Sequence, residues 1–397
     1  MNHRFATRTS LFLLLLSMIS LLGNTATAQG TILTGQNRNY ISTGMPIILV
    51  APDGVASGMG DAGVASTPDA NSAHWNNAKF AFAPSNIGIS LTYTPWLRNL
   101  KVSDMNLMYL GGYKKLNNRS AVAASLTYFS LGEINHTGEM GEDQGTFTPN
   151  ELAFDITYAL KLNKNLSLGA SGRFLYSDLT NGMEVQGQST KPPKSLAADV
   201  GLYYEKPIDQ KNTFAAGAFI SNLGSMLSYS DDDTRREYLP ANLRIGGRYT
   251  FEYDEFNKIN FLLDFNKLLV PTPPIHGDDT IYSRYYHSMT EYYDRGTILG
   301  AIQSFYDAPG GIREELQEIQ ISAGAEYWYS NTIAVRAGYF YESNTKGGRR
   351  YLTFGVGLRY NVMRFDLSYL VPTTTISTNP LANTLRIALS VDLNKKK

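Results

Sequence analysis

The sequence contains no cysteine. Disulfide bonds, cysteine nucleophiles and zinc–thiolate sites are therefore excluded. A lipoprotein anchor is excluded as well, because that modification needs a cysteine at the start of the mature chain. Whatever stabilises the fold is noncovalent.

The chain also lacks an excess of either charge, with 35 basic and 35 acidic residues. A nucleic-acid-binding protein normally has a basic excess or a basic stripe on its surface. We therefore expect no nucleic-acid partner.

Long apolar runs are nearly absent. The one conspicuous run, 11–22, is shorter than the about 20 residues that a membrane-spanning helix needs. Arg4 and Arg8 precede it and Ala26-Thr27-Ala28 follows it, an arrangement typical of a secretory signal peptide. We expect residues 1–28 to be removed near Ala28, and no later run is long enough for a membrane-spanning helix.

What the chain does contain is 26 tyrosines, 35 glycines and many short segments in which apolar and polar residues alternate. In the clearest segment, 241–251, Leu243 and Ile245 share one face of a strand while Arg244 and Arg248 share the other. One face suits lipid and the opposite face does not. Such strands are typical of a membrane β-barrel with an apolar outside, a polar inside and aromatic girdles.

Fourteen segments show this alternation: 85–96, 101–114, 120–135, 150–161, 166–179, 195–206, 213–221, 241–253, 258–267, 318–328, 333–342, 350–360, 363–370 and 384–393. Bacterial single-chain barrels have an even number of strands of about 10 residues each. The sequence thus predicts an all-β fold, a 14-stranded antiparallel transmembrane β-barrel over residues 85–397.

The connections between these segments differ in length in a regular way. Short links are 116–119, 162–165, 207–212, 254–257, 329–332 and 361–362, and long ones are 136–149, 180–194, 222–240, 268–317 and 371–383. Outer-membrane barrels have short periplasmic turns and longer extracellular loops. A soluble β-sandwich gives no reason for such sorting, so the connections favour a barrel in the outer membrane of a Gram-negative bacterium.

Residues 29–84, before the first predicted strand, alternate little and are rich in Gly, Ala and Asn. We expect this segment to form a hatch or plug in the barrel lumen. The inward faces of the strands carry charges of both signs: Arg173, Arg244, Arg248, Arg336, Arg359, Arg364, Arg386, Asp155, Asp199, Asp264, Glu326, Glu342 and Asp366. Because an ion-selective channel more often has a ring of one sign, this mixture predicts a cross-linked and occupied interior.

The hatch contains Gly58-Met59-Gly60-Asp61-Ala62-Gly63, which matches the G-x-G-x-x-G dinucleotide motif. That motif binds a cofactor only at the strand-to-helix turn of a βαβ unit. Here a polar stretch and then membrane strands follow it. We therefore expect no cofactor.

Metal and catalytic sites are not indicated either. The histidines, at positions 3, 74, 136, 276 and 287, lie at no metal-ligand spacing. Asp231-Asp232-Asp233 and Asp278-Asp279 could bind calcium, but carboxylates in outer loops are usually solvated. Neither G-x-S-x-G nor a local serine, histidine and acid arrangement is present, so we predict that the protein is not an enzyme.

The connection 268–317 is the longest. We expect about 50 structureless residues here, and connections of this length are usually functional or disordered. It carries aromatic residues that could contact a partner protein: Tyr282, Tyr285, Tyr286, Tyr292, Tyr293, Phe305 and Tyr306. Tyrosine gives a large contact area at low entropic cost. In the alternative interpretation the connection is a lid over the barrel mouth, and the same aromatics pack against one another.

A Gly-rich stretch, 57–65, is followed by Trp75-Asn76-Asn77-Ala78. This arrangement resembles the hatch of the fatty-acid-transporter-like (FadL-like) barrels, in which such a stretch precedes Trp-Asn-Pro-Ala. Asn77 stands where that pattern usually has proline. The resemblance implies that Gly58, Gly60, Gly63, Trp75, Asn76 and Asn77 shape the hatch.

Within that superfamily, the stretches 365–372 and 379–386 make the chain similar to the PorV (LptO) family, outer-membrane components of the type IX secretion system of the Bacteroidetes. This resemblance implies a barrel that binds secreted cargo by its C-terminal signal domain, binds the translocon subunit, and delivers cargo to the surface attachment complex with its sortase. The superfamily also implies an alternative, an outer-membrane transporter of hydrophobic small molecules. A surface enzyme acting on lipid would need a nucleophile that no motif indicates.

Overall fold

The computed structural model describes residues 40–97, 104–137, 142–183, 189–230, 236–273, 275–276, 281–282, 289–374 and 381–394. The expected signal peptide, residues 29–39, Tyr285, Tyr286 and both candidate calcium clusters, Asp231-Asp232-Asp233 and Asp278-Asp279, lie outside these ranges. The side chain of Tyr282 is not described either.

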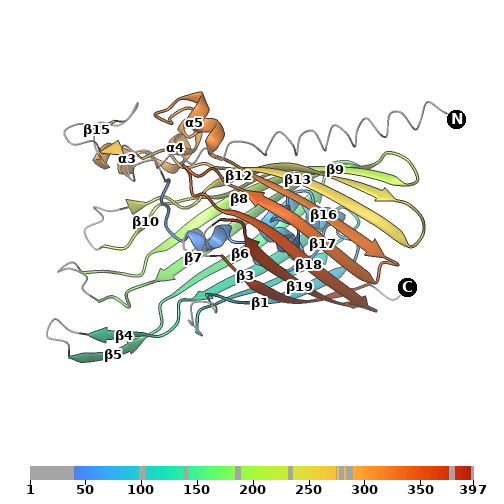
Figure 1. Ribbon diagram of the computed structural model, residues 1–397, viewed down its shortest axis with the longest axis horizontal. Helices are drawn as coiled ribbons and strands as arrows, with labels where there is room; N and C mark the ends of the chain where they lie inside the picture. The colour runs from blue at the N-terminus through green and yellow to red at the C-terminus, as the bar shows by residue number, and fades with distance from the viewer. Residues whose placement is uncertain are drawn as a thin grey trace. The chain divides into compact units, whose positions relative to one another are not determined.

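Within the described ranges, fourteen strands form one closed antiparallel barrel, in which β1 pairs with β20 (Figure 1). The strands are β1 Ile87–Pro95, β2 Asn106–Lys115, β3 Ser120–Ser130, β6 Asn150–Lys161, β7 Leu166–Asp178, β8 Lys194–Pro207, β9 Asn212–Gly224, β12 Asn242–Glu252, β13 Asn257–Leu268, β16 Ile319–Tyr329, β17 Ile333–Tyr341, β18 Arg350–Tyr360, β19 Met363–Pro372 and β20 Leu385–Leu393. The predicted fold class is confirmed. Closure leaves no unpaired strand edge, as a membrane requires.

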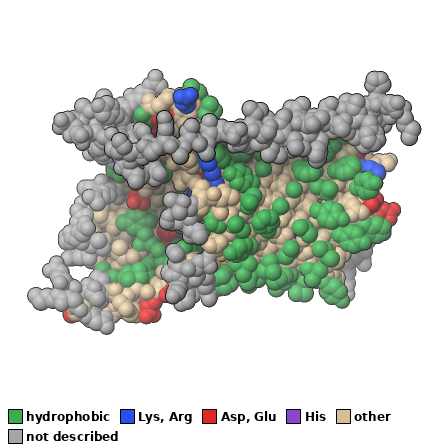
Figure 2. Space-filling view, in the orientation of Figure 1, with side chains coloured by type: hydrophobic (Ala, Val, Ile, Leu, Met, Phe, Trp, Pro, Cys, Tyr) green, Lys and Arg blue, Asp and Glu red, His purple; other side chains and the backbone are tan. Residues whose placement is uncertain are grey.

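Side chains alternate between the two surfaces of the wall. On β8, Ser195 and Asp199 are buried and face the interior, while Leu196 and Val200 are exposed on the outside. Hydrophobic side chains of this outward set cover the side of the barrel that Figure 2 shows. The outside is therefore the lipid-facing surface.

The predicted strand 120–135 is too long. The structure ends β3 at Ser130, and Gly132 then takes a left-handed conformation with φ of 85°. Beyond this turn, β4 (Ile134–Thr137) pairs with β5 (Asp143–Phe147) as a separate hairpin. Alternation continued through the turn in the sequence, so periodicity alone did not reveal it.

The prediction of a structureless connection over 268–317 is wrong. It contains two short strands, β14 (Ile275–His276) and β15 (Ile281–Tyr282), and three helices, α3 (Met289–Asp294), α4 (Thr297–Gln303) and α5 (Ile312–Gln317). In Figure 1 these helices lie at the end of the barrel that carries the long connections, which we call the extracellular end. A smaller ribbon, β10 (Leu227–Ser228) with β11 (Arg236–Glu237), lies in the connection after β9.

Residues 40–84, called the lumenal segment below, occupy the barrel interior. They form η2 (Pro46–Leu49), η3 (Ser57–Met59), α2 (Ser72–Trp75) and η4 (Asn77–Phe82). The η3 turn contacts β16 to β19, and η4 contacts β6 to β8 on the other side of the interior (Figure 1). The lumenal segment thus bridges the two halves of the barrel.

Among the helices of the described residues, none has both the length and the apolar character that crossing a membrane demands.

Candidate functional site

Two glycines let the lumenal segment approach the wall very closely. Gly60 has φ of 68°, and its N–H donates to Thr353 Oγ1 over 2.7 Å. A Cβ atom on Gly338 of β17 would lie 2.0 Å from the Gly60 nitrogen. No side chain fits between the two backbones. This contact fixes the position of η3 in the interior.

Gly63 sits between Trp75 and a carboxylate of the wall. A Cβ atom on Gly63 would lie 2.2 Å from Trp75 Cδ2. The N–H groups of Gly63 and Val64 donate to Asp264 Oδ2 over 2.7 and 2.8 Å. Hydrogen bonds to an ionised acceptor are stronger than neutral ones, so Asp264 is a principal tether of the lumenal segment.

Trp75 is almost fully buried. Its Nε1 donates to Asp53 Oδ2 over 2.6 Å, which joins two parts of the lumenal segment that are 22 residues apart. The guanidinium carbon of Arg244 lies 4.6 Å from the centre of the indole ring, in a cation–π arrangement. The burial of Asp53 raises its pKa, and the nearby Asp69 raises it further.

Asn76 and Asn77 link the segment to β7 and β8. Asn76 Nδ2 donates to the carbonyl oxygens of Val64 and Leu202, over 3.1 and 2.8 Å. Asn77 Nδ2 donates to Ser171 Oγ over 2.7 Å, a bond that proline at this position could not make. Asn77 therefore contributes a tether of its own, in place of the proline of the FadL-like pattern.

Several charged side chains of the interior form ion pairs across strands and with the lumenal segment. Arg336 lies 2.8 Å from both Glu326 and Asp366. Arg364 lies 2.8 Å from Asp366 and 3.0 Å from Asp69 of the lumenal segment. The expected cross-linked and occupied interior is therefore present.

A cavity of about 210 Å³ remains between the lumenal segment and the wall. Its lining includes the charged residues Arg248, Lys258, Glu326, Arg359 and Arg364. A hydrophobic ligand there would remove water from charged groups without replacing the lost hydrogen bonds, which is costly. This cavity does not suit an apolar molecule.

A second candidate site lies outside the lumen, on α4, α5 and the turn between them. Ala301 of α4 is buried against Ala241 and Leu269, with Ile220 and Leu243 alongside. Ile220 and Leu243 are paired in register and share the outward face of β9 and β12. The α4 helix is therefore attached to the outside of the wall, near the extracellular ends of these strands.

The opposite side of α4 and one side of α5 are apolar and exposed. Seven large side chains there are between 49% and 75% exposed, and we call them the apolar cap: Ile298, Leu299, Ile302, Phe305, Tyr306, Ile312 and Leu316. An apolar group of this size outside the lipid-facing wall indicates an interaction surface.

The aromatic residues predicted as partner contacts differ in how far their side chains are exposed. Tyr292 is buried, where its hydroxyl donates to Pro271 O over 3.0 Å and its carbonyl accepts from Tyr238 Oη over 2.9 Å. Tyr293 is half-buried beside it. Of the four whose side chains the structure describes, Phe305 and Tyr306 are exposed. Tyr292 thus stabilises the loop itself.

A cluster of ion pairs fixes α5 to the barrel. Lys267 lies 3.0 Å from Glu315 and 2.5 Å from Glu318, and Lys346 lies 2.6 Å from Glu314 and 2.9 Å from Glu318. Because Lys267 is on β13 and Lys346 is in the connection between β17 and β18, α5 is held to the wall and to a neighbouring loop. We call these residues the α5 anchor.

Asp307, between α4 and α5, has an unusual titration. Its carboxylate accepts hydrogen bonds from Thr272 N and Oγ1 over 3.0 and 2.9 Å. Burial nevertheless raises the pKa of Asp307 to about 7, and the neighbouring Glu318 and Glu315 add to the rise. Asp307 is therefore a buried group that titrates near neutral pH, in the turn that carries Phe305 and Tyr306.

The family assignment rests on sequence. The family model described as type IX secretion system protein PorV matches residues 33–275, more than half of the 397-residue chain. This chain belongs to the PorV family. PorV-family membership makes it an outer-membrane component of the type IX secretion system. No curated protein matches the chain.

Several solved structures of other proteins are similar to this chain. A TodX mutant, a monoaromatic hydrocarbon channel, has a TM-score of 0.50 and 13% identity over 86% of this chain and 98% of its own. The toluene transporter TodX of Pseudomonas putida has a TM-score of 0.49 and 14% identity, over 89% of this chain and 98% of its own. A FadL homologue of Pseudomonas aeruginosa has a TM-score of 0.45 and 11% identity, over 90% of this chain and 100% of its own. At these identities the likeness to the PorV-family chain concerns fold alone.

Sequence reasoning missed the aliphatic part of the apolar cap in this PorV-family protein. It selected aromatic residues, whereas Ile298, Leu299, Ile302, Ile312 and Leu316 have the greatest exposure there. The spacing of Ile298 with Ile302, and of Ile312 with Leu316, is four residues, which places each pair on one face of a helix. That spacing was the available signal.

Proposed function

We propose that this PorV-family barrel is a carrier and docking protein. In this proposal it binds secreted cargo by the C-terminal signal domain, binds the translocon subunit, and delivers cargo to the surface attachment complex with its sortase. The observation that carries the proposal is the apolar cap, which exposes seven large apolar side chains on an anchored helical unit outside the lumen.

The rigidity of the apolar cap supports a role in protein binding. The α5 anchor and the packing of Ala301 hold its helices in place before a partner arrives. A preorganised surface loses little entropy on binding. Because α4 packs near the extracellular ends of β9 and β12, a partner can contact its exposed side without entering the lumen.

The occupied interior supports the same proposal. We infer that residues 29–84 act as a fixed hatch, and that Gly58, Gly60, Gly63, Trp75, Asn76 and Asn77 keep it seated. A fixed hatch favours protein binding at the outer surface over passage of a molecule through the lumen. The charged lining of the lumenal cavity also disfavours the alternative function, transport of a hydrophobic small molecule.

The test is co-purification of the tagged barrel in mild detergent, followed by mass spectrometry. The cap variant carries Ile298→Ser and Ile302→Ser. The control carries Ile208→Ser and Phe256→Ser, which remove two apolar side chains of similar exposure from the short turns at the other end. Both variants should migrate as folded barrels on gels run without heating.

We expect the native barrel and the control to recover a large translocon subunit and exported proteins that share a C-terminal domain, and the cap variant to lose them. Equal recovery with the cap variant would remove the apolar cap from the proposal. A native barrel recovered only with bound apolar small molecules would favour the transporter.

A further inference from the structure

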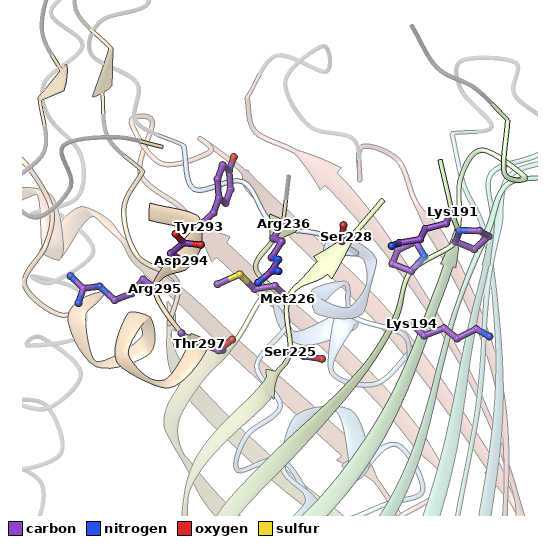
Figure 3. A pocket seen from close by; sticks show the side chains of 13 residues that line it. Lys191, Lys194, Ser225, Met226, Ser228, Arg236, Tyr293, Asp294, Arg295 and Thr297 are labelled. Atoms are coloured by element: carbon purple, nitrogen blue, oxygen red, sulfur yellow. The ribbon is translucent and has the colours of Figure 1, made fainter. Parts of the chain in front are cut away.

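A cavity of about 630 Å³ lies beside the apolar cap, at the extracellular ends of β8 and β9. Figure 3 shows its three sides: Lys191 and Lys194 before and at the start of β8, Ser225, Met226 and Ser228 after β9, and the segment 293–297 opposite. Apart from sharing Tyr293 with the aromatic residues considered above, this cavity is distinct from the lumen and from the apolar cap.

Hydrogen bonds between the three sides fix the cavity's shape. Thr297 Oγ1 donates to Gly224 O over 2.8 Å, and Lys191 N donates to Tyr229 O over 3.0 Å. The hydroxyl of Ser195 on β8 lies 2.7 Å from Ser225 O. The cavity is therefore preformed and does not depend on a ligand to assemble it.

The lining of the cavity is strongly basic. Among the described residues that line it, Lys191, Lys194, Arg236 and Arg295 are basic and Asp294 is acidic. Within the chain as a whole the two charges are equal in number. Such a concentration of positive charge favours an anionic ligand.

The position of Lys194 indicates where that ligand comes from. Lys194 begins β8 on its outward face, which it shares with Leu196, 69% exposed, and Val200, 47% exposed. It pairs in register with Tyr176 of β7, whose ring lies on the same side of the wall. A lysine and a tyrosine directly above an apolar band occupy the depth at which lipid headgroups lie.

We propose that this cavity binds the phosphate-bearing headgroup of an outer-leaflet lipid whose headgroup is anionic overall. The headgroup phosphate lies among Lys194, Arg236 and their basic neighbours, and the acyl chains run along Leu196 and Val200. A lipid is favoured over free phosphate because the basic cavity continues directly into the lipid-facing wall. The site does not depend on partner binding by the apolar cap.

The test counts lipids retained by the full-length barrel. The barrel is exchanged into nanodiscs of phosphatidylglycerol or phosphatidylcholine, extracted in detergent, and examined by native mass spectrometry. The site variant carries Lys194→Gln and Arg236→Gln. The control carries Lys164→Gln and Arg119→Gln, which remove the same two side-chain types from short turns at the other end.

We expect the native barrel and the control to retain phosphatidylglycerol and to release phosphatidylcholine. The site variant should retain roughly 10-fold less phosphatidylglycerol, since each basic residue near a membrane surface contributes appreciably to anionic lipid binding. Equal retention by the site variant, or equal retention of both lipids by the native barrel, would overturn the proposal.

A further arm adds inorganic phosphate to the delipidated barrel. Phosphate bound by the native barrel but not by the site variant, without preference for phosphatidylglycerol, would show an anion site that takes free phosphate and would contradict the lipid assignment. Unchanged recovery of translocon and cargo with the site variant is expected, because the apolar cap is intact.

Discussion

The carboxylate of Asp264 on β13 accepts a hydrogen bond of 2.7 Å from the backbone N–H of Gly63, so a side chain of the barrel wall holds the lumenal segment directly. The same oxygen accepts from Val64. Asp264 is fully buried, so no bulk water can replace it when it is removed.

Replacing Asp264 by Ala should therefore loosen the lumenal segment while the barrel persists. Two buried N–H groups lose their acceptor, at a cost of about 1–3 kcal/mol each. We expect a lower unfolding temperature on gels run after stepwise heating, and higher conductance in planar bilayers. Asp264→Asn is the matched control, since its amide oxygen can still accept both bonds. An Ala variant as closed and as stable as the control would contradict the role assigned to Asp264.

Replacing Gly338 by Ala should prevent η3 from seating. The added Cβ would lie 2.0 Å from Gly60 N and 2.1 Å from Met59 C, both backbone atoms that cannot move aside. Gly172→Ala is the control, because a Cβ there meets nothing within 4 Å. We expect the Gly338 variant to show increased protease cleavage within residues 40–84 and the control to resist. Equal resistance would mean that the segment is not held where the structure places it.

Much of the barrel could be predicted from the sequence, because lipid on one side and polar groups on the other impose strict alternation. The predicted segments 150–161 and 350–360 coincide with β6 and β18. The prediction for the loop 268–317 was wrong because its helices are short and their apolar residues face outward. A search for alternation or for a long apolar run does not detect them.

The lumenal contacts were only partly predictable. The glycines and Trp75 were selected through a motif, but the partners that explain them, Gly338, Thr353 and Asp264, lie hundreds of residues away or on other strands. Which wall residues the lumenal segment contacts is decided by the tertiary structure. Asn77 shows the same point, since its bond to Ser171 becomes visible only when β7 is placed beside it.

Replacing Lys267 by Met should release α5 from the wall. It leaves Glu315 and Glu318 buried without this partner, and removing one member of a buried ion pair costs about 3–5 kcal/mol. We expect faster hydrogen exchange in residues 297–317 and reduced partner recovery, although every apolar cap side chain is still present. Lys164→Met, in a short turn, is the control. Unchanged exchange would show that the α5 anchor does not position the apolar cap.

The order of the same region should depend on pH. The pKa of Asp307 is about 7 in the folded protein and 3.8 ordinarily, so the folded form binds its proton more tightly. The contribution of Asp307 to stability therefore falls as the pH rises from 3.8 to about 7, and is constant above that. We expect residues 297–317 to open more readily at about pH 8 than at about pH 5, after correction for intrinsic exchange rates. The Asp307→Asn variant should show a weaker pH dependence of opening. If the pH dependence keeps its full size in this variant, groups other than Asp307 cause it.

The most direct test of the secretion role is export in cells that lack the native protein. Such cells are complemented with the native chain, with the Ile298→Ser and Ile302→Ser variant, or with the Ile208→Ser and Phe256→Ser control, and each barrel is quantified in the outer membrane. We predict that the native chain and the control return cargo to the cell surface, whereas the cap variant leaves cargo in the periplasm at an equal barrel level. Full surface delivery by the cap variant would contradict the account.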